Sequence, residues 1–336
     1  MDTCGYFGQE ECYMESLQTY FVDDKQMTRL SCLHDSVYNL VKDKRCLYVD
    51  VPMYFNIGDH LISGGGTFDF FKRKAVRLEE VVPITCFDRA CVEDIDVVVF
   101  QGGGNFGDIW PDIHERRMQI VEHLLAAGKE VVILPQSICY QSSQLRDRDA
   151  RIIKFNKNFH LFTRDQNSFQ IASEISSNAY LAPDMAHQLY DRLLDVRKSV
   201  HIANDNIALF RKDKEAISAR KGYISTLDCL DWDDIVSQTP YYRTMKRYIK
   251  LYRWIHCKIG VSGYEREMSG WKSTSWKIIL HAAKCFAKAN VVITNRLHGV
   301  ILSALVGRKF KAVDNNYGKL SGYIDKWFCN NQKDGI

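Results

Sequence analysis

The sequence predicts an α/β protein built from two doubly wound, Rossmann-like domains that face each other across a cleft. Short apolar segments rich in β-branched residues alternate with amphipathic segments along both halves of the chain, which is typical of parallel βαβ units. The length of 336 residues suits two domains rather than one. A charged segment at 189–202 separates the two alternating regions, so we expect domains at 1–190 and 191–336.

Apolar patterning gives the individual elements in chain order. In the first half we expect a helix at 114–128 and strands at CLYVDV (46–51), IDVVVF (95–100), EVVILP (130–135), FHLFTR (159–164) and NAYLAP (178–183). In the second half we expect helices at 276–289 and 299–307 and strands at NIALFR (206–211), NVVIT (290–294) and KFKAV (309–313). Ligands bind such sheets at the carboxyl ends of the strands, so the candidate residues are those that follow a strand.

Composition excludes several classes of protein. The net charge of +4 is weak for a nucleic-acid binder, so no nucleic-acid partner is expected. No apolar run is long enough to span a bilayer, and the first residues carry acids without an apolar stretch. We therefore expect a cytoplasmic protein, with the inner face of the plasma membrane as a possible peripheral location. The eleven cysteines form no CxxC pair and no histidines have zinc spacing, so we expect free thiols and no metal site.

The most informative motif is NVVITNRLHGVILSAL (290–305), in which a strand leads through a polar turn into an apolar helix that Gly299 opens. A helix N-terminus presents unpaired N–H groups and partial positive charge, so this turn suits an anion. Arg296 adds a planar fork for phosphate or carboxylate, and His298 adds a group that exchanges protons near neutral pH. A capped turn with a surface arginine and histidine is the alternative that the motif leaves open.

Two glycine-bearing motifs follow predicted strands. In FQGGGNFGDIW (100–110), three consecutive glycines let the backbone approach a ligand closely, although a tight turn with positive φ also explains them. The motif matches neither GxGxxG nor the Walker pattern. FNIGDHLI (55–62) places Asp59 at a strand exit, where it either binds sugar hydroxyls, acts as a base or caps a helix.

Two further arginines come directly after predicted strands, Arg164 in TRDQNS (163–168) and Arg211 in LFRKDKE (209–215). A single arginine at a strand end is usually solvated or paired with a carboxylate. Because Arg296 occupies the same kind of position, the three together favour an anion-binding cleft.

In this order NIGDHLI, GGGNFGDIW, LPQSI (134–138), TRDQNS, LFRKDKE and TNRLHG resemble the motifs of the polysaccharide pyruvyl transferase family, over about residues 50–305. The resemblance implies a two-domain fold like that of the GT-B glycosyltransferases. It also implies transfer of the enolpyruvyl group of phosphoenolpyruvate to a hexose of a cell-surface polysaccharide, exopolysaccharide or capsule, or of its lipid-linked precursor. The product is then a pyruvate ketal and phosphate, and no metal or organic cofactor is expected.

The resemblance also implies roles for particular residues. The donor would contact Arg296, Leu297 and His298 and one earlier arginine, for which Arg164 is the best match and Arg211 the alternative. From the chemistry of this donor, we expect His298 to protonate its methylene carbon and Asp59 or Asp108 to take the proton of the acceptor hydroxyl. We expect acceptor contacts from Asn56, Asp59, Gly103, Gly104, Asn105, Gln136 and Ser137.

The segment YYRTMKRYIKLYRWIHCKI (241–259) is basic and aromatic and contains no acid. Met245, Ile249 and Tyr252 follow helical spacing, while Arg243, Arg247 and Lys250 gather on another face. This pattern indicates either a helix that lies on anionic lipid headgroups or on the diphosphate of a lipid-linked glycan, or a solvated helix with an aromatic core stripe.

Two other functions compete with pyruvyl transfer. A sugar-nucleotide-dependent glycosyltransferase would share the expected fold, but it would want a site for base and ribose that the motifs do not supply. A non-catalytic protein that binds glycan or phosphate would need the cleft but not His298.

Overall fold

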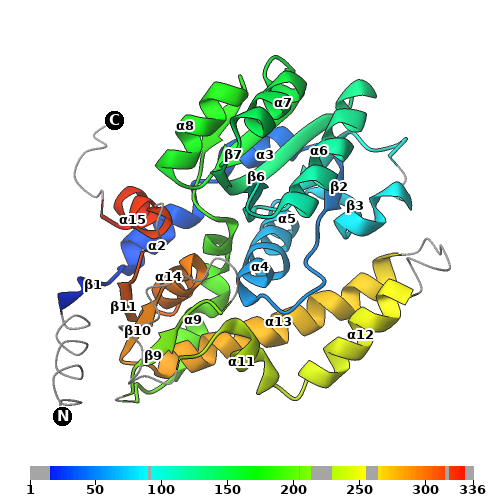
Figure 1. Ribbon diagram of the computed structural model, residues 1–336. Helices are drawn as coiled ribbons and strands as arrows, with labels where there is room; N and C mark the ends of the chain where they lie inside the picture. Colours follow the sequence, from blue (N-terminus) through cyan, green and yellow to red (C-terminus); the bar gives the residue numbers. More distant parts are fainter. Residues whose placement is uncertain are drawn as a thin grey trace, which may run out of the picture.

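The computed structural model describes residues 16–89, 92–203, 205–212, 229–254, 264–314 and 318–329. Within these residues the strands form two sheets with helices packed around them (Figure 1). The larger sheet has the order β3-β2-β4-β6-β7-β8, with β5 also paired to β6, and its strand pairs are parallel. The smaller sheet has the order β1-β11-β10-β9 and is parallel except where β1 meets β11.

The strands carry short, mostly buried apolar segments. The larger sheet contains β2 (Arg45–Val49), β3 (Arg77–Val82), β4 (Val97–Phe100), β5 (Gly103–Gly107), β6 (Glu130–Cys139), β7 (Phe159–Thr163) and β8 (Ala179–Leu181). The smaller sheet contains β1 (Thr19–Tyr20), β9 (Ile207–Leu209), β10 (Val291–Thr294) and β11 (Lys309–Ala312). All four residues of β4 and all five of β7 are buried, as expected of parallel strands covered on both faces.

Helices connect the strands and cover the sheets. In the first half they are α2 (Asp24–Ser31), α3 (Asp35–Val41), α4 (Ile57–His60), α5 (Phe68–Arg73), α6 (Pro111–Ala126), α7 (Ser143–Ile153) and α8 (Gln166–Ile175). In the second half they are α9 (Tyr190–Ser199), α11 (Trp232–Ser237), α12 (Tyr242–Trp254), α13 (Tyr264–Lys288), α14 (Leu297–Leu305) and α15 (Lys319–Ile324). The described residues also contain short π or 3-10 helices, namely η1 (Leu61–Thr67), η2 (Ile84–Arg89), η3 (Met185–Leu189) and η5 (Asp325–Cys329).

The predicted α/β architecture with parallel sheets is confirmed, and each strand predicted above is present within a few residues. Three strands were not predicted, namely β1, β3 and β5. The division at 190/191 stays a prediction, but one segment of each predicted domain packs against the other domain's half of the chain. Strand β1 joins the smaller sheet, and α15 packs against α8 beside the larger one (Figure 1).

The segment from Pro183 to Gln188, which follows β8, is where these distant parts meet. His34 donates from Nε2 to the carbonyl of Pro183 at 2.9 Å and accepts at Nδ1 from Gln188 at 2.6 Å. The Tyr323 hydroxyl of α15 accepts from the backbone N–H of Asp184 at 3.1 Å. These contacts fix the backbone on both sides of Asp184 from the two ends of the chain.

Acidification should weaken the fold through His34. Burial lowers the pKa of His34 to about 4, from a usual value of 6.5, because the charged ring would lose water. Between these values the unfolded chain binds the proton that the folded chain excludes, so the free energy of unfolding should fall from pH 6.5 to 4, by roughly 3 kcal/mol from this residue. Urea unfolding at a series of pH values measures this.

The matched variants are His34→Gln, which keeps one donor and one acceptor, and His201→Gln at an exposed position. His34→Gln should flatten the pH dependence, and His201→Gln should leave it as in the wild type. Equal slopes for His34→Gln and the wild type would show that the buried ring does not control acid stability.

Candidate functional site

A cavity of about 590 Å³ lies where residues of the two halves meet. Its polar lining comes from the loops after strands and from helix starts, and its lining residues include three arginines, a lysine and a histidine. The lining consists of Tyr54, Phe55, Asn56, Asp59, Gly104, Asn105, Trp110, Ile113, Arg164, Arg211, Lys212, Asp231, Trp232, Asp233, Asn295, Arg296, Leu297, His298 and Leu320. The lining residues include four permanently charged cations, three arginines and a lysine, and three carboxylates. The lining therefore has a net positive charge, which suits an anion.

The turn after β10 brings Arg296, Leu297 and His298 to this cavity. Helix α14 begins at Leu297, two residues earlier than predicted from Gly299, so His298 lies in its first turn. The Thr294 hydroxyl donates to the carbonyl of Leu209 at 2.7 Å and accepts from the Arg296 N–H at 3.0 Å, which ties the turn to β9. The N-terminal amides and the side chains of the turn therefore converge on one place.

Arg164 and His298 meet at a buried carboxylate that the sequence did not single out, that of Asp184. Arg164 donates from Nη1 to Asp184 Oδ2 at 2.6 Å, and His298 Nε2 lies 3.3 Å from the same oxygen. Burial acts to raise the pKa of Asp184, but the charges of His298 and Arg164 outweigh burial and hold that pKa well below its usual value. Asp184 is therefore ionised, and it links Arg164 and His298, which both line the cavity.

A second carboxylate orients Arg296. Asp231 accepts from Arg296 Nη2 at 2.6 Å and from the backbone N–H of Lys212 at 2.9 Å. Asn295 accepts from the backbone N–H of Arg211 at 2.9 Å. Both candidate arginines of the earlier motifs, Arg164 and Arg211, thus reach the cavity together with Arg296.

The start of α4 forms another part of the wall. Asn56 is the N-cap of α4, and its side chain accepts from the N–H of Gly58 at 3.0 Å, so the interpretation of Asp59 as the cap is wrong. Asp59 instead lines the cavity. Burial and the neighbouring Asp59 carboxylate, to which Tyr54 is hydrogen-bonded, raise the pKa of Tyr54 well above its usual value, so Tyr54 stays a neutral donor.

Gly58 itself is required by His298. A Cβ atom added to Gly58 would lie much closer to His298 Nδ1 than the van der Waals contact distance allows. The φ of Gly58 is negative, so glycine is needed here for space and not for conformation. The NIGDH motif of the first half therefore makes room for the histidine of the second half.

The glycine-rich motif differs from the prediction. Gly103 to Gly107 form β5 and not a turn, although Gly103 and Gly107 do have the positive φ that was expected of these glycines. A Cβ on Gly102 would lie 2.6 Å from the carbonyl of Pro135. The close approach that Gly102 and Gly107 permit is therefore to strand β6. Gly104 and Asn105 do line the cavity.

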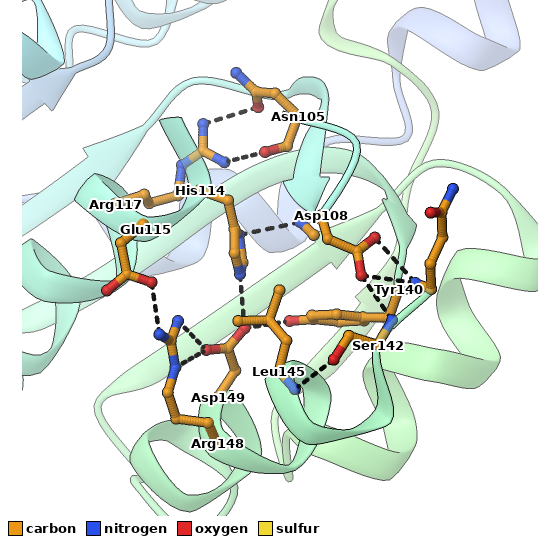
Figure 2. A network of polar contacts seen from close by, with 12 residues as sticks. Asn105, Asp108, His114, Glu115, Arg117, Tyr140, Ser142, Leu145, Arg148 and Asp149 are labelled. Atoms are coloured by element: carbon orange, nitrogen blue, oxygen red, sulfur yellow. Dashed lines mark hydrogen bonds and ion pairs between the residues drawn. The ribbon is translucent and has the colours of Figure 1, made fainter. Parts of the chain in front are cut away.

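Asn105 is held by a buried arginine (Figure 2). Arg117 donates to the Asn105 carbonyl at 3.1 Å and to Asn105 Oδ1 at 2.8 Å, and it also pairs with Asp50 at 2.8 Å. The oxygen of the Asn105 amide is thereby occupied, and its nitrogen points away from Arg117 (Figure 2).

A buried network of polar contacts connects β5, α6 and α7 (Figure 2), and Trp110, the N-cap of α6, lines the cavity. His114 accepts at Nδ1 from the Gly107 N–H at 3.0 Å and contacts Asp149 through Nε2 at 2.6 Å. Tyr140 donates to the same Asp149 oxygen at 2.7 Å. The network gives β5 and the start of α6 a rigid support.

Four predicted site residues are not among those that line the cavity. Asp108 accepts from the backbone N–H groups of Gln141 and Ser142 at 2.8 and 2.7 Å and fixes the loop before α7. Gln136 donates to the Gln101 carbonyl at 2.7 Å. Ser137 accepts from Arg164 Nε at 3.0 Å, so it helps to orient a residue that does line the cavity. Gly103 is buried beside Asp59.

Comparisons with known proteins identify the family of the chain. The family model described as polysaccharide pyruvyl transferase matches residues 23–317, which is most of the chain. The chain belongs to the polysaccharide pyruvyl transferase family. Membership of this family implies a transferase with a glycan acceptor.

Individual relatives support the assignment to this family. EpsO of Bacillus subtilis (strain 168), whose name assigns it to the pyruvyl transferases, is 31% identical over 290 residues, covering 85% of this chain and 86% of that protein. Pyruvyl transferase 1 of Schizosaccharomyces pombe is 28% identical and covers 71% of this chain and 56% of its own length. A crystal structure of an uncharacterized Klebsiella pneumoniae protein shares the fold, with a TM-score of 0.58, 19% identity and coverage of 92% of this chain and 96% of that one.

The sequence reasoning missed Asp184, Asp231 and Lys212 and the aromatic residues Tyr54 and Trp110 of the cavity wall. Asp184 follows the predicted strand NAYLAP and Lys212 follows NIALFR, so the rule that selected Arg164 and Arg211 could have selected them. Asp231 had no predicted strand before it. Among the described residues, no group of three or more His, Cys, Asp or Glu is placed to hold a metal ion.

The contact between Gly58 and His298 can be tested by adding one methyl group. Gly58→Ala should lower turnover at least about tenfold, because the new Cβ displaces the His298 ring from the cavity wall. Gly270→Ala in α13 is the control, since nothing lies within 4 Å of its Cβ position. It should keep activity and add up to about 1 kcal/mol of stability. Normal turnover of Gly58→Ala would show that the ring position is not critical.

Proposed function

We propose that this protein transfers the enolpyruvyl carbons of phosphoenolpyruvate to a hexose of a surface polysaccharide or its precursor, forming a pyruvate ketal and releasing phosphate. The observation that carries the proposal is the convergence of Arg164, Arg211, Arg296 and His298 on one cavity. Phosphoenolpyruvate bears a phosphate and a carboxylate on one carbon, and guanidinium groups at a helix N-terminus suit such a pair of anions. The positive charge comes from the protein, so we also propose that no metal or organic cofactor takes part.

The chemistry assigns a role to each group. His298 gives a proton to the methylene carbon, and the carbon that bears the phosphate becomes cation-like and open to a sugar hydroxyl. Asp59, which lines the cavity beside Tyr54, takes the proton of that hydroxyl. The arginines stabilise the charge of the departing phosphate.

We place the acceptor at the wall formed by α4 and β5. Asn56, Asp59, Gly104 and Asn105 supply polar groups there, and Tyr54, Phe55 and Trp110 supply rings that suit the apolar face of a sugar. Three of the four lining cations, Arg211, Lys212 and Arg296, follow β9 and β10 of the smaller sheet. A donor side and an acceptor side of a GT-B-like arrangement would then face each other between the two sheets.

A donor test separates this proposal from its rivals. The protein is incubated with phosphoenolpyruvate, a sugar nucleotide and a glycan acceptor, and the consumption of each donor is followed. Pyruvyl transfer consumes phosphoenolpyruvate and releases phosphate. Consumption of the sugar nucleotide would identify a glycosyltransferase, and consumption of neither would identify a binding protein.

His298 should be required for the chemical step. His298→Gln keeps a hydrogen-bond donor but has no proton to give, so turnover should fall about 10²- to 10⁴-fold while the apparent affinity for phosphoenolpyruvate changes far less. His123→Gln, exposed on α6, is the control. Near-normal turnover of His298→Gln would leave His298 a binding residue only.

We also propose that the acceptor is lipid-linked and that α12 meets the membrane surface. Met245, Ile249 and Tyr252 are buried, so the aromatic stripe belongs to the core, while Arg243, Lys246, Arg247 and Lys250 are exposed. No described helix is long and apolar enough to cross a bilayer. The basic face is therefore the part of α12 that anionic headgroups could attract. The predicted segment continues to residue 259, and 255–259 lie outside the described residues.

Removing this charge should weaken binding to vesicles. Arg243, Arg247 and Lys250 changed together to Gln should lower affinity for vesicles containing anionic phospholipid by about 1 kcal/mol per charge, with activity on a short soluble acceptor retained. The same change at the exposed Arg151, Lys154 and Lys157 near α7 is the control. If both triple variants sediment with vesicles as the wild type does, α12 does not contact the membrane through this face.

A further inference from the structure

The two ring nitrogens of His298 face different surroundings. Nε2 lies 3.3 Å from Asp184 Oδ2 and is buried without a hydrogen-bond partner. Nδ1 packs against the backbone of Gly58 at the start of α4, where no Cβ intervenes. The neighbours of Gly58 on that helix, Asn56 and Asp59, line the cavity. One nitrogen is therefore turned toward a buried carboxylate and the other toward the cavity wall on the acceptor side.

Asp184 is rigidly placed. Its Oδ1 accepts from the Ala186 N–H at 2.9 Å and its Oδ2 from Arg164 Nη1 at 2.6 Å. Its side chain is fully buried. A carboxylate held at both oxygens has no freedom to turn away from His298.

The charges around the ring single out Asp184 as the anion at Nε2. The other titratable or charged groups on the surrounding elements are Arg164 after β7, His187 on η3, Asp59 on α4 and Arg296 in the same turn. Burial lowers the pKa of His187 to about 3, so His187 stays neutral. Asp59 lies on α4 next to Gly58, the residue against which Nδ1 packs.

We propose that Asp184 is a positioning residue that holds Nε2–H of His298, so that Nδ1 is the nitrogen that gives the proton to the methylene carbon of the donor. This inference rests on the proposed function. A carboxylate that binds one nitrogen of a histidine fixes the tautomer and leaves the other nitrogen for proton transfer. The distance of 3.3 Å between Nε2 and Oδ2 is of the kind that tightens when a substrate is bound.

The proton and electron pairs balance in this step. The Nδ1–H bond breaks and the electron pair of the C=C bond forms the new C–H bond, while Nε2–H stays with Asp184. The first sugar hydroxyl bonds to the cationic carbon, and its proton goes to Asp59. The second hydroxyl displaces phosphate, which leaves with that hydroxyl's proton.

The test compares Asp184→Asn with Ser137→Ala. The amide introduced by Asp184→Asn keeps an acceptor for the Ala186 N–H but removes the negative charge, and Ser137→Ala removes the other contact of Arg164 without touching His298. For Asp184→Asn we expect turnover to fall at least about tenfold and the loss of turnover with rising pH to begin about one pH unit lower, because the charged ring loses its counter-ion. For Ser137→Ala we expect a higher KM for phosphoenolpyruvate and an unchanged pH profile.

A measurement on the wild-type protein covers the case in which Asp184→Asn does not fold. In spectra of the full chain labelled with ¹⁵N-histidine, the signals absent from His298→Gln belong to His298. Neutral His298 should carry its proton on Nε2. A proton on Nδ1, or a pH profile of folded Asp184→Asn equal to that of the wild type, would overturn the inference. If His298→Gln itself retains turnover, the proposed role of His298 fails instead.

Discussion

The contact of one buried carboxylate with an arginine and a histidine is the constraint on which this site depends. Asp184 binds Arg164 from the end of β7 and faces His298 from the start of α14. Burying a carboxylate costs free energy unless it is paired. The arrangement of the two halves that brings Arg164 and His298 to Asp184 is therefore the stable one. The same arrangement makes the cavity wall, with Arg296, Arg211 and Asp59 placed around it.

The surrounding structure keeps that carboxylate in position. His34 and Gln188 hold the backbone of Pro183, and Tyr323 of α15 bonds the backbone of Asp184 and the ring of His187. Trp327 of η5 donates to the Arg164 carbonyl at 2.7 Å. Segments near both ends of the described chain thus brace the site, and α15 and η5 support the larger sheet as well as the smaller one.

The sequence predicted the parts of this structure that depend on local pattern. Buried parallel strands are short apolar runs, so β4, β6 and β10 could be recognised, and the residues that follow strands gave Arg164, Arg211, Arg296 and His298. Pairings between distant residues leave no such pattern. The need for glycine at position 58 depends on His298, which is distant in the sequence. Asp108 binds two backbone N–H groups of the loop before α7 and does not line the cavity, and that contact too is distant in the sequence. The glycine run at 102–104 resembled a ligand-binding loop because close approach of the backbone to a neighbouring strand requires glycine, as close approach to a ligand does.

A crystal structure of the protein with phosphoenolpyruvate, or with an unreactive analogue that keeps its phosphate and carboxylate, tests the central claim most directly. The site described here predicts the two anionic groups between the guanidinium groups of Arg164 and Arg296, with the methylene carbon beside His298 Nδ1 and Asp184 still bound to Arg164. A donor bound elsewhere, or bound with its methylene carbon away from His298, would contradict it.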